Sequence, residues 1–569
     1  MIEDVYEPLA RYRDDFRGRF AALAAERLDA LVGKSGVDIR ANAKTSDEAL
    51  ALFGSARSHG RWKTFHGIVS ALFFVACALS ACACCLGEFE RRDFAALVAG
   101  GCVALGLGVL FAVWCRSRAK LQRNTEDAAR AKRDEAWAQM APLNGLFGWD
   151  EANRLIEKTV PRIAFDPYFT ASRLDALKRL YGLDDSFFAG KSMLFVQSGR
   201  INGNPFVFGQ YLEMEWGEKT YEGTKTISWT EYERDANGRR RAVRRTQTLH
   251  AYVTKPIPVY GDHKILLYGN DAAPRLSFSR RPSGLSAKGG LFESLKKRRR
   301  LADLREFSRN LDDDSNFTLM SNEEFETWFH AKDRDDEVEF RLLFTPVAQT
   351  QMLTLMKDAE IGFGDDFSFV KSGKMNFLSS VHLDAGSINT DPSRFADWDF
   401  RKVGRKFADF SAAYFKDVYF ALAPLLAIPL YQQTRTHEDI WREFASGESS
   451  SSWEHEAIAN YHGESHFAHP ECMTRSILKT RVAAREDGAS VVSVTASGYK
   501  GIDRVEYKSV YGNDGRWHDV PVRWVEYLPV SHTGSICVDE REKPSDGFSS
   551  RYAQSSASAF RRSIYSFVR

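Results

Sequence analysis

Two long stretches without charged side chains near the N-terminus constrain this chain more than any other feature. The first runs from Thr64 to Gly87 and contains 24 residues without Asp, Glu, Lys or Arg, and the second runs from Phe94 to Cys115 and contains 22. At about 1.5 Å per residue, each stretch forms a helix at least about 30 Å long, which is enough to cross the hydrocarbon core of a bilayer. The sequence therefore predicts two transmembrane helices.

Two other interpretations, buried core helices of a soluble protein and a cleaved signal peptide, explain these stretches less well than transmembrane helices do. Buried core helices of a soluble protein rarely lack charge on every face for six turns. A cleaved signal peptide is disfavoured because residues 1–63 are mostly polar and precede the first stretch. We therefore predict a transmembrane hairpin over residues 64–115, with spans at 64–87 and 94–115.

The basic residues that flank the spans predict how the hairpin is oriented. Outside the hairpin lie Arg57, Arg61, Lys63, Arg116, Arg118, Lys120 and Arg123, and they outnumber Arg91 and Arg92 in the connector. Because cytoplasmic flanks carry the excess of Lys and Arg, both termini are expected in the cytoplasm.

Small residues give the spans a further pattern. Ala96, Gly100, Ala104 and Gly108 recur every four residues in the second span, so they either let a neighbouring helix approach closely or are ordinary small membrane residues. Six of the eight cysteines also lie in the spans, which leaves Cys472 and Cys537 for the rest of the chain. This usage gives no disulfide framework and fits a cytosolic body.

The overall composition excludes several classes of protein. Of the 569 residues, 44% are hydrophobic, and 78 Lys and Arg nearly balance 76 Asp and Glu. A disordered chain or a collagen would have neither this hydrophobic content nor this balance. A net charge of +2 also gives no global reason to expect nucleic-acid binding, so that partner is considered unlikely.

The remaining segments predict an α+β fold. Residues 1–63 and 116–160 favour helices that form a stalk, and residues 161–430 mix strands and helices in a cytosolic domain. The Asn237–Gly238 pair predicts a hairpin turn. Residues 431–545 are expected to be helical and then β-rich, and residues 546–569 form a predicted flexible tail with a short helix that contains Phe560, Ile564 and Phe567.

Shorter patterns predict individual elements inside the α+β domain. Glu339–Phe344 favours a strand, Val347–Ala359 a helix, and Phe367–Val370 and Met375–Leu378 two more strands. The apolar run Val418–Tyr431 contains Pro424 and Pro429. It is too short and too broken to cross a bilayer, so we expect a buried or interfacial segment.

Part of the domain resembles a known family. Asn316-Phe317, Phe325, Asp335, Glu337, Arg341-Leu-Leu-Phe-Thr-Pro346 and Met356 look like a block from an uncharacterised family of bacterial membrane proteins. The resemblance covers roughly residues 1–430. It implies two N-terminal spans, a cytosolic mixed α/β domain and a location in the bacterial inner membrane, and it assigns no active-site residues. This chain continues past Leu430, where shorter family members end.

Two clusters of basic residues suggest a contact with the membrane surface. Arg239, Arg240, Arg241, Arg244 and Arg245 follow the predicted turn, and Lys296-Lys297-Arg298-Arg299-Arg300 lies in a predicted flexible basic loop at residues 279–302. Each cluster is either simply solvated or in contact with anionic lipid headgroups. A nucleic-acid patch is a third alternative, which the scarcity of interleaved aromatic residues disfavours.

One constellation of residues has the composition of a metal site. His462, His466, His469 and Cys472 follow one another at short intervals, and His462 and His466 would share one face of a helix, as two zinc ligands require. Chance clustering explains the same residues, Gly463 weakens the helix, and a pH-sensing role is a further alternative. The spacing matches neither a zinc finger nor a His-Glu-x-x-His motif.

The sequence contains no phosphate-binding loop, dinucleotide fingerprint, nucleophile elbow or kinase motif set. We therefore expect a membrane-anchored binding or scaffolding module without catalytic residues, cofactor or metal, whose protein partner the sequence does not identify. The alternative is a membrane-tethered metalloenzyme that uses zinc at the His/Cys cluster. A transporter is disfavoured because the spans contain no Asp, Glu, Lys or Arg.

Overall fold

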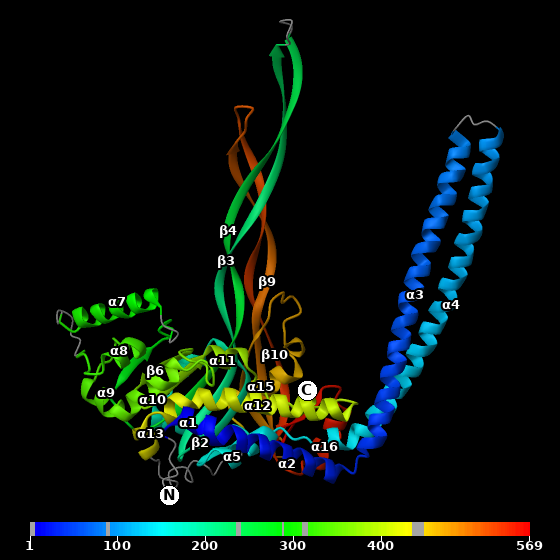
Figure 1. Cartoon of the computed structure of the whole chain (residues 1–569). Helices are drawn as coiled ribbons and strands as arrows, with labels where there is room; N and C mark the ends of the chain where they lie inside the picture. The colour runs from blue at the N-terminus through cyan, green and yellow to red at the C-terminus, as the bar shows by residue number, and fades with distance from the viewer. Residues whose placement is uncertain are drawn as a thin grey trace. The chain divides into compact units, whose positions relative to one another are not determined.

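The computed structural model describes residues 6–86, 91–234, 240–286, 290–309, 317–434, 449–486 and 488–569 (Figure 1). Helices and antiparallel strands alternate along the chain, so the predicted α+β class is confirmed. The contacts divide the chain into a helical unit and a sheet-containing unit. The helical unit comprises Ala21–Gly148 and Asp391–Ser411, and the other unit comprises Met1–Phe20, Trp149–Thr390 and Ala412–Arg569.

Two long helices dominate the helical unit. They are α3 (Ile39–Leu86) and α4 (Arg91–Asn144), which run antiparallel to each other (Figure 1). Both are long and apolar enough to cross a membrane, and only 6% of the most apolar segment of each helix is buried within the protein. A core helix of a soluble protein would be mostly buried, so the exposure favours a membrane environment. The turn between them lies outside the described residues.

The two helices pack along one continuous seam. Residues that are at least half-buried recur at alternating steps of three and four, which is the spacing of an antiparallel coiled coil. On α3 these residues are Asn42, Thr45, Ala49, Leu52, Ala56, His59, Lys63, His66, Ser70, Phe73, Cys77, Ser80 and Cys84. On α4 they are Leu97, Gly101, Ala104, Gly108, Phe111, Cys115, Arg118, Gln122, Thr125, Ala129, Lys132, Ala136, Gln139 and Leu143.

Hydrogen bonds tie the seam together both in the apolar stretches and in the stalk. The Ser70 hydroxyl donates to the Gly108 carbonyl at 2.8 Å, and the Ser80 hydroxyl donates to the Leu97 carbonyl at 2.7 Å. In the stalk, the Gln139 amide donates to the Thr45 hydroxyl at 3.1 Å. The predicted packing of the two stalk segments against each other is therefore confirmed for these helices.

The predicted ladder of small residues lies only partly on the seam. A Cβ atom on Gly108 would lie 3.3 Å from the Phe74 ring, whereas a Cβ on Gly100 would have no neighbour within 4 Å. Ala96 is exposed like Gly100. The glycine that actually faces α3 in this region is Gly101, because a strict step of four drifts away from the three-and-four spacing of a coiled coil.

Two antiparallel sheets form the second unit. The first has the order β1-β2-β3-β4-β7-β6-β5 and the second has the order β11-β12-β10-β9-β8. The strands of the first sheet are β1 (Ile163–Phe165), β2 (Lys191–Ile201), β3 (Asn204–Arg234), β4 (Arg240–Gly269), β5 (Ser277–Arg280), β6 (Phe367–Ser372) and β7 (Met375–Ser380). Those of the second are β8 (Ile477–Glu486), β9 (Ala489–Tyr511), β10 (Trp517–Asp539), β11 (Ser558–Arg561) and β12 (Ile564–Val568).

The helices of this unit complete the fold. They are α1 (Pro8–Arg11), α5 (Glu151–Thr159), α6 (Ala171–Tyr181), α7 (Leu291–Phe307), α8 (Glu323–Phe329), α9 (Glu337–Leu343), α10 (Pro346–Lys357), α11 (Val381–Ala385), α13 (Pro429–Gln433), α15 (Ser452–His462) and α16 (Asp546–Gln554). Two further helices, α2 (Arg17–Ser35) and α12 (Phe400–Leu426), belong partly to each unit.

The two sheets repeat one connection order. In the first, α6 leads into β2, β3 and β4, and the later hairpin β6–β7 pairs with β4 through β7. In the second, α15 leads into β8, β9 and β10, and the later hairpin β11–β12 pairs with β10 through β12. In both repeats, the two longest strands form a hairpin.

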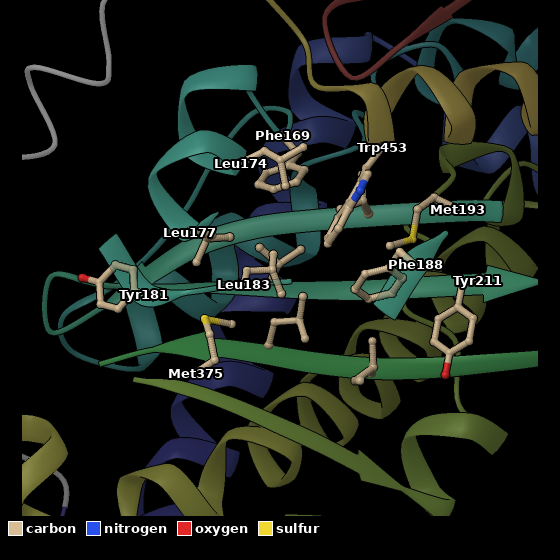
Figure 2. Packing of buried hydrophobic residues seen from close by; sticks show 14 of the residues in the cluster. Phe169, Leu174, Leu177, Tyr181, Leu183, Phe188, Met193, Tyr211, Met375 and Trp453 are labelled. Atoms are coloured by element: carbon tan, nitrogen blue, oxygen red, sulfur yellow. The ribbon is translucent and has the colours of Figure 1, made fainter. Parts of the chain in front are cut away.

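Helix α15 lies between the cores of the two repeats. Trp453 and Ala457 join the first core, in which Trp453 lies beside Phe169 and Phe188 (Figure 2). Ile458 and Ala459 join the second core. Because opposite faces of one helix are buried in different cores, α15 fixes one repeat against the other.

Several short predictions are wrong. Glu339–Phe344 is mostly in helix α9 and not a strand, because the Asp336 side chain caps the helix by accepting the Glu339 N–H. The predicted flexible loop at residues 279–302 contains the end of β5 and most of α7, so the Lys296–Arg300 run is helical. The helix Val347–Ala359 and the strands Phe367–Val370 and Met375–Leu378 are confirmed as α10, β6 and β7.

The tail at residues 546–569 is ordered. It forms α16, β11 and β12, and Phe567 is buried in a small core with Phe548. The predicted helix around Ile564 is a β-hairpin, because Arg562 and Ser563 adopt the left-handed conformation that a tight turn needs. The run Val418–Tyr431 is almost entirely buried, in agreement with the expectation. The Asn237–Gly238 turn lies outside the described residues.

Candidate functional site: a paired β-hairpin arm

The long hairpin of each repeat extends beyond its sheet. Strand β3 pairs with β2 only as far as Glu213, and from there to Arg234 it pairs with β4 alone. At about 3.3 Å per residue, this free part is about 65 Å long. The hairpin β9–β10 extends in the same way, and the two hairpins lie side by side as one arm (Figure 1).

The hairpins pack face to face through apolar side chains. Since side chains alternate between the faces of a strand, the odd-numbered residues of β3 and β4 meet the even-numbered residues of β9 and β10. The buried cluster contains Ile227, Leu249, Ala251, Val253, Val520 and Val522. Gly223 lies so close to the second hairpin that a Cβ atom there would collide with the carbonyl oxygen of Pro521.

Polar contacts flank this interface. The Lys255 ammonium pairs with Glu506 at 2.8 Å, and the Lys225 ammonium donates to the Asp519 carbonyl at 3.0 Å. At the end of the shorter hairpin, the Asn513 N–H donates to the Gln247 side chain at 2.8 Å. These contacts join the hairpins over most of the length of the shorter one and make the arm a two-layer structure.

The outer face of the first hairpin is polar. The Thr220 and Thr254 hydroxyls lie 3.0 Å apart across the strands, and those of Thr226 and Thr248 lie 3.3 Å apart. The other exposed hydroxyl residues of this face are Thr224, Ser228, Thr230 and Thr246. Its exposed aromatic residues include Tyr252 and, nearer the far end of the hairpin, Tyr232.

The outer face of the second hairpin is aromatic. Tyr507 is 66% exposed, Tyr511 57% and Trp517 70%. Tyr511 and Trp517 are directly opposite each other across the strands, with their ring centroids 5.4 Å apart. Exposed aromatic side chains that gather on one face mark interaction surfaces, because they bury much apolar area on binding. We call Tyr507, Tyr511 and Trp517 the aromatic strip.

The arginine cluster lies at the far end of the first hairpin. Arg245 pairs with Glu231 and Glu233, and Arg244 donates to the Ser228 hydroxyl at 3.4 Å. Arg240 and Arg241 are exposed. Arg239 lies outside the described residues. Two of the predicted basic side chains therefore have partners within the arm.

A groove of about 470 Å³ opens at the base of the arm between the two repeats. Its lining includes Met214 and Tyr260 from the first repeat and Lys479, Tyr499 and Val530 from the second. Apolar walls with one ammonium group are typical of a site for a small organic ligand.

A buried carboxyl lies beneath Lys479. Glu456 accepts a hydrogen bond from the Lys479 ammonium at 2.9 Å and from the Met193 N–H at 3.0 Å. Burial raises the pKa of Glu456 to about 7, against the opposing effect of Lys479. This group therefore gains and loses its proton near neutral pH. It couples α15 to both repeats, since Met193 belongs to the first and Lys479 to the second.

The predicted His/Cys cluster is not assembled as a ligand set. Helix α15 ends at His462 because Gly463 adopts a φ of 105°, so His462 and His466 are not one helical turn apart, and that prediction is wrong. Across the described residues, which include all four candidate ligands, no three His, Cys, Asp or Glu side chains are grouped to hold a metal ion.

Each candidate ligand has local contacts. The His462 Nε2 lies 2.9 Å from the Ser566 hydroxyl, and burial together with the charges of His466 and Arg561 lowers the pKa of His462 to about 4. The His469 Nδ1 accepts the Glu471 N–H at 3.1 Å. Burial of Cys472 is outweighed by hydrogen bonds with Thr474 and Ser476, which lower the pKa of the thiol.

The structure also contains a serine, a histidine and an aspartate whose contacts follow the Ser–His–Asp arrangement of a hydrolase triad. Asp366 lies 2.6 Å from the His382 Nδ1, and Ser380 lies 3.4 Å from the Nε2. The adjoining cavity of about 10 Å³ holds no more than a water molecule. The Ser380 hydroxyl also accepts the Leu383 N–H as the cap of α11. Asp366 and Ser380 therefore stabilise the start of α11, since each accepts a backbone N–H there.

Comparison with protein-family models, curated proteins and solved structures finds no match to this chain.

Sequence reasoning predicted strands in both hairpins, but it missed the packing of the hairpins into one arm and the groove at its base. The alternation in β3 and β9 signals strands, but the aromatic strip becomes a surface only once the opposite faces are buried against each other. The residues of that interface lie more than 250 positions apart in the sequence. The groove has the same origin, because its walls come from different repeats.

Proposed function

We propose that this chain is a membrane-anchored binding module in which the β-arm binds a partner protein through the aromatic strip. The observation that carries the proposal is the exposure of Tyr507, Tyr511 and Trp517 on the outer face of the second hairpin. The inner face of that hairpin is already buried against the first hairpin. Tyr and Trp are the residues that contribute most to protein–protein binding energy.

The anchor in this proposal is the α3–α4 hairpin. We propose a multi-pass protein of the bacterial inner membrane with both termini in the cytoplasm, which is the orientation that the flanking Lys and Arg favour. The arm then operates at the inner face of the membrane. Membership of the uncharacterised bacterial family remains a prediction from the block that contains Arg341–Pro346.

Anchoring also makes a modest aromatic surface sufficient for binding. A partner that is itself confined to the membrane meets the arm at a raised effective concentration, so weak contacts give a stable complex. The exposed arginines near the tip of the first hairpin add charge that suits an acidic partner or anionic headgroups.

Co-purification from crosslinked cells tests the proposal. Tagged full-length protein is extracted in detergent and compared with a Tyr507→Ser/Tyr511→Ser/Trp517→Ser variant and with Tyr252→Ser, which removes an exposed aromatic residue from the opposite face. A discrete partner is expected with the wild type and with Tyr252→Ser, and its recovery should fall about tenfold or more in the triple variant, as loss of several aromatic contacts predicts. Recovery of the wild-type protein alone contradicts the proposal.

A further inference from the structure

A second groove lies in the helical unit, on the surface of α3 and α4. Its volume is about 610 Å³, and it includes Thr64, the first residue of the uncharged stretch. Next to it, Trp62 and Phe65 are about half exposed, as is Trp114 on α4. Aromatic side chains of this kind gather at the depth of the lipid headgroups. The groove therefore lies at the boundary between the stalk and the membrane span.

Three arginines line this groove. Arg57 and Arg61 are one helical turn apart on α3, and Arg130 comes from α4. All three are exposed, and within the described ranges none has a carboxylate partner. Further along the stalk the pattern differs, because Lys132 pairs with both Glu48 and Glu135. The guanidinium groups of the three groove arginines are therefore available to an anion.

The remaining polar groups of the groove suit a phosphate ester whose headgroup has a hydroxyl group. The one carboxylate, Glu126, accepts a hydrogen bond from the Gln122 amide at 2.7 Å. The Gln122 carbonyl oxygen is buried and has no hydrogen-bond partner in the described part of the chain. Gly60 makes room for this amide, since a Cβ atom there would lie 3.3 Å from it. Phe53 and Ala56 add an apolar floor.

We propose that this groove binds the headgroup of an anionic glycerophospholipid. Arg57, Arg61 and Arg130 contact the phosphate, because arginine presents paired N–H groups to its oxygens. The Gln122 carbonyl accepts a hydrogen bond from a headgroup hydroxyl, and the acyl chains follow the uncharged faces of the adjoining helices. Basic pockets between membrane helices bind such lipids. The inference rests on the proposed membrane anchor and adds a ligand to it.

The experiment uses the full chain in a zwitterionic detergent and measures bound lipid by native mass spectrometry. Phosphatidylglycerol and phosphatidylcholine are added in equal amounts to the wild type, to Arg57→Gln/Arg61→Gln and to a control, Arg116→Gln/Arg123→Gln. The control removes the same charge from exposed positions of α4 outside the groove. Phosphatidylglycerol binding is expected to fall about tenfold or more in the groove variant and to stay at the wild-type level in the control.

Three results would overturn the inference. They are equal binding of the two lipids by the wild type, unchanged phosphatidylglycerol binding in the groove variant, and complete displacement of the lipid by millimolar inorganic phosphate, which would assign the groove to a free anion. Alkaline carbonate extraction of membranes separates this inference from the anchor. Release of the protein by carbonate contradicts the anchor itself, whereas retention together with unchanged lipid binding contradicts the groove alone.

Discussion

Gly223 shows how one residue sets the distance between the hairpins of the arm. The carbonyl of Pro521 occupies the space that a Cβ atom would take. The variant Gly223→Val should therefore separate the hairpins and cost about 1–3 kcal/mol of stability in the arm. Hydrogen exchange of the β9 and β10 amides measures the effect, and Thr224→Val on the exposed face is the control. Equal protection in both variants would contradict the tight packing.

Glu456 makes the stability of α15 depend on pH. Its pKa is about 7 in the folded chain and 4.5 in the unfolded chain. The folded state therefore holds the extra proton between these values, and stability falls as pH rises from about 4.5 to about 7, by up to about 3 kcal/mol. The glutamine side chain of the Glu456→Gln variant cannot ionise, so the stability of this variant should not show this decline with rising pH. Melting temperatures of both proteins from pH 5 to pH 8 test this, and parallel profiles would contradict it.

At the scale of elements, the α3–α4 pair is held by a seam that places small residues where the helices are closest. A Cβ atom added to Gly101 would lie 3.1 Å from the Ser80 hydroxyl oxygen, whereas a Cβ on Gly100 would have no neighbour within 4 Å. The variant Gly101→Val should lower the melting temperature of the helical unit in detergent by several degrees, because the helices must move apart. Gly100→Val should not. Equal melting temperatures for the Gly101→Val and Gly100→Val variants would contradict the packing of Gly101 against α3.

The same scale shows which elements the sequence predicts well. The two apolar helices were predictable because composition alone over more than 20 residues excludes most alternatives. Helix α9 was not, because six residues with a strand-like pattern carry less information than the Asp336 cap that starts the helix. The order of residues 546–569 was also missed, since β12 is stabilised by pairing with β10, a non-local contact that no pattern within the tail reveals.

The candidate site was predicted least well, for a related reason. The interval between His462 and His466 suits two metal ligands only in a continuous helix, and the single residue Gly463 ends that helix. The aromatic strip, in contrast, has no local motif. Tyr507, Tyr511 and Trp517 become conspicuous only because Val520 and Val522 on the opposite face are buried against the first hairpin.

At the scale of the whole molecule, the repeated connection order explains how an arm of this length is stable. A lone two-stranded hairpin is marginal in water. Here each repeat contributes one hairpin, and the two bury an apolar face against each other. Deleting the free part of β9 and β10, with Gly498 joined by a short turn to Val530, its partner across the strands, should expose Ile227 and Leu249. We expect the free part of β3 and β4 to become sensitive to protease, and continued resistance would contradict mutual support.

Photocrosslinking in living cells tests the central claim most directly. A benzophenone amino acid is placed at Tyr507, at Trp517 or at Tyr252, which are similarly exposed but lie on opposite faces of the arm. The proposed function predicts a discrete adduct of higher mass from Tyr507 and Trp517 and none from Tyr252. Equal adducts from both faces, or no adduct from any of the three positions, would contradict binding through the aromatic strip.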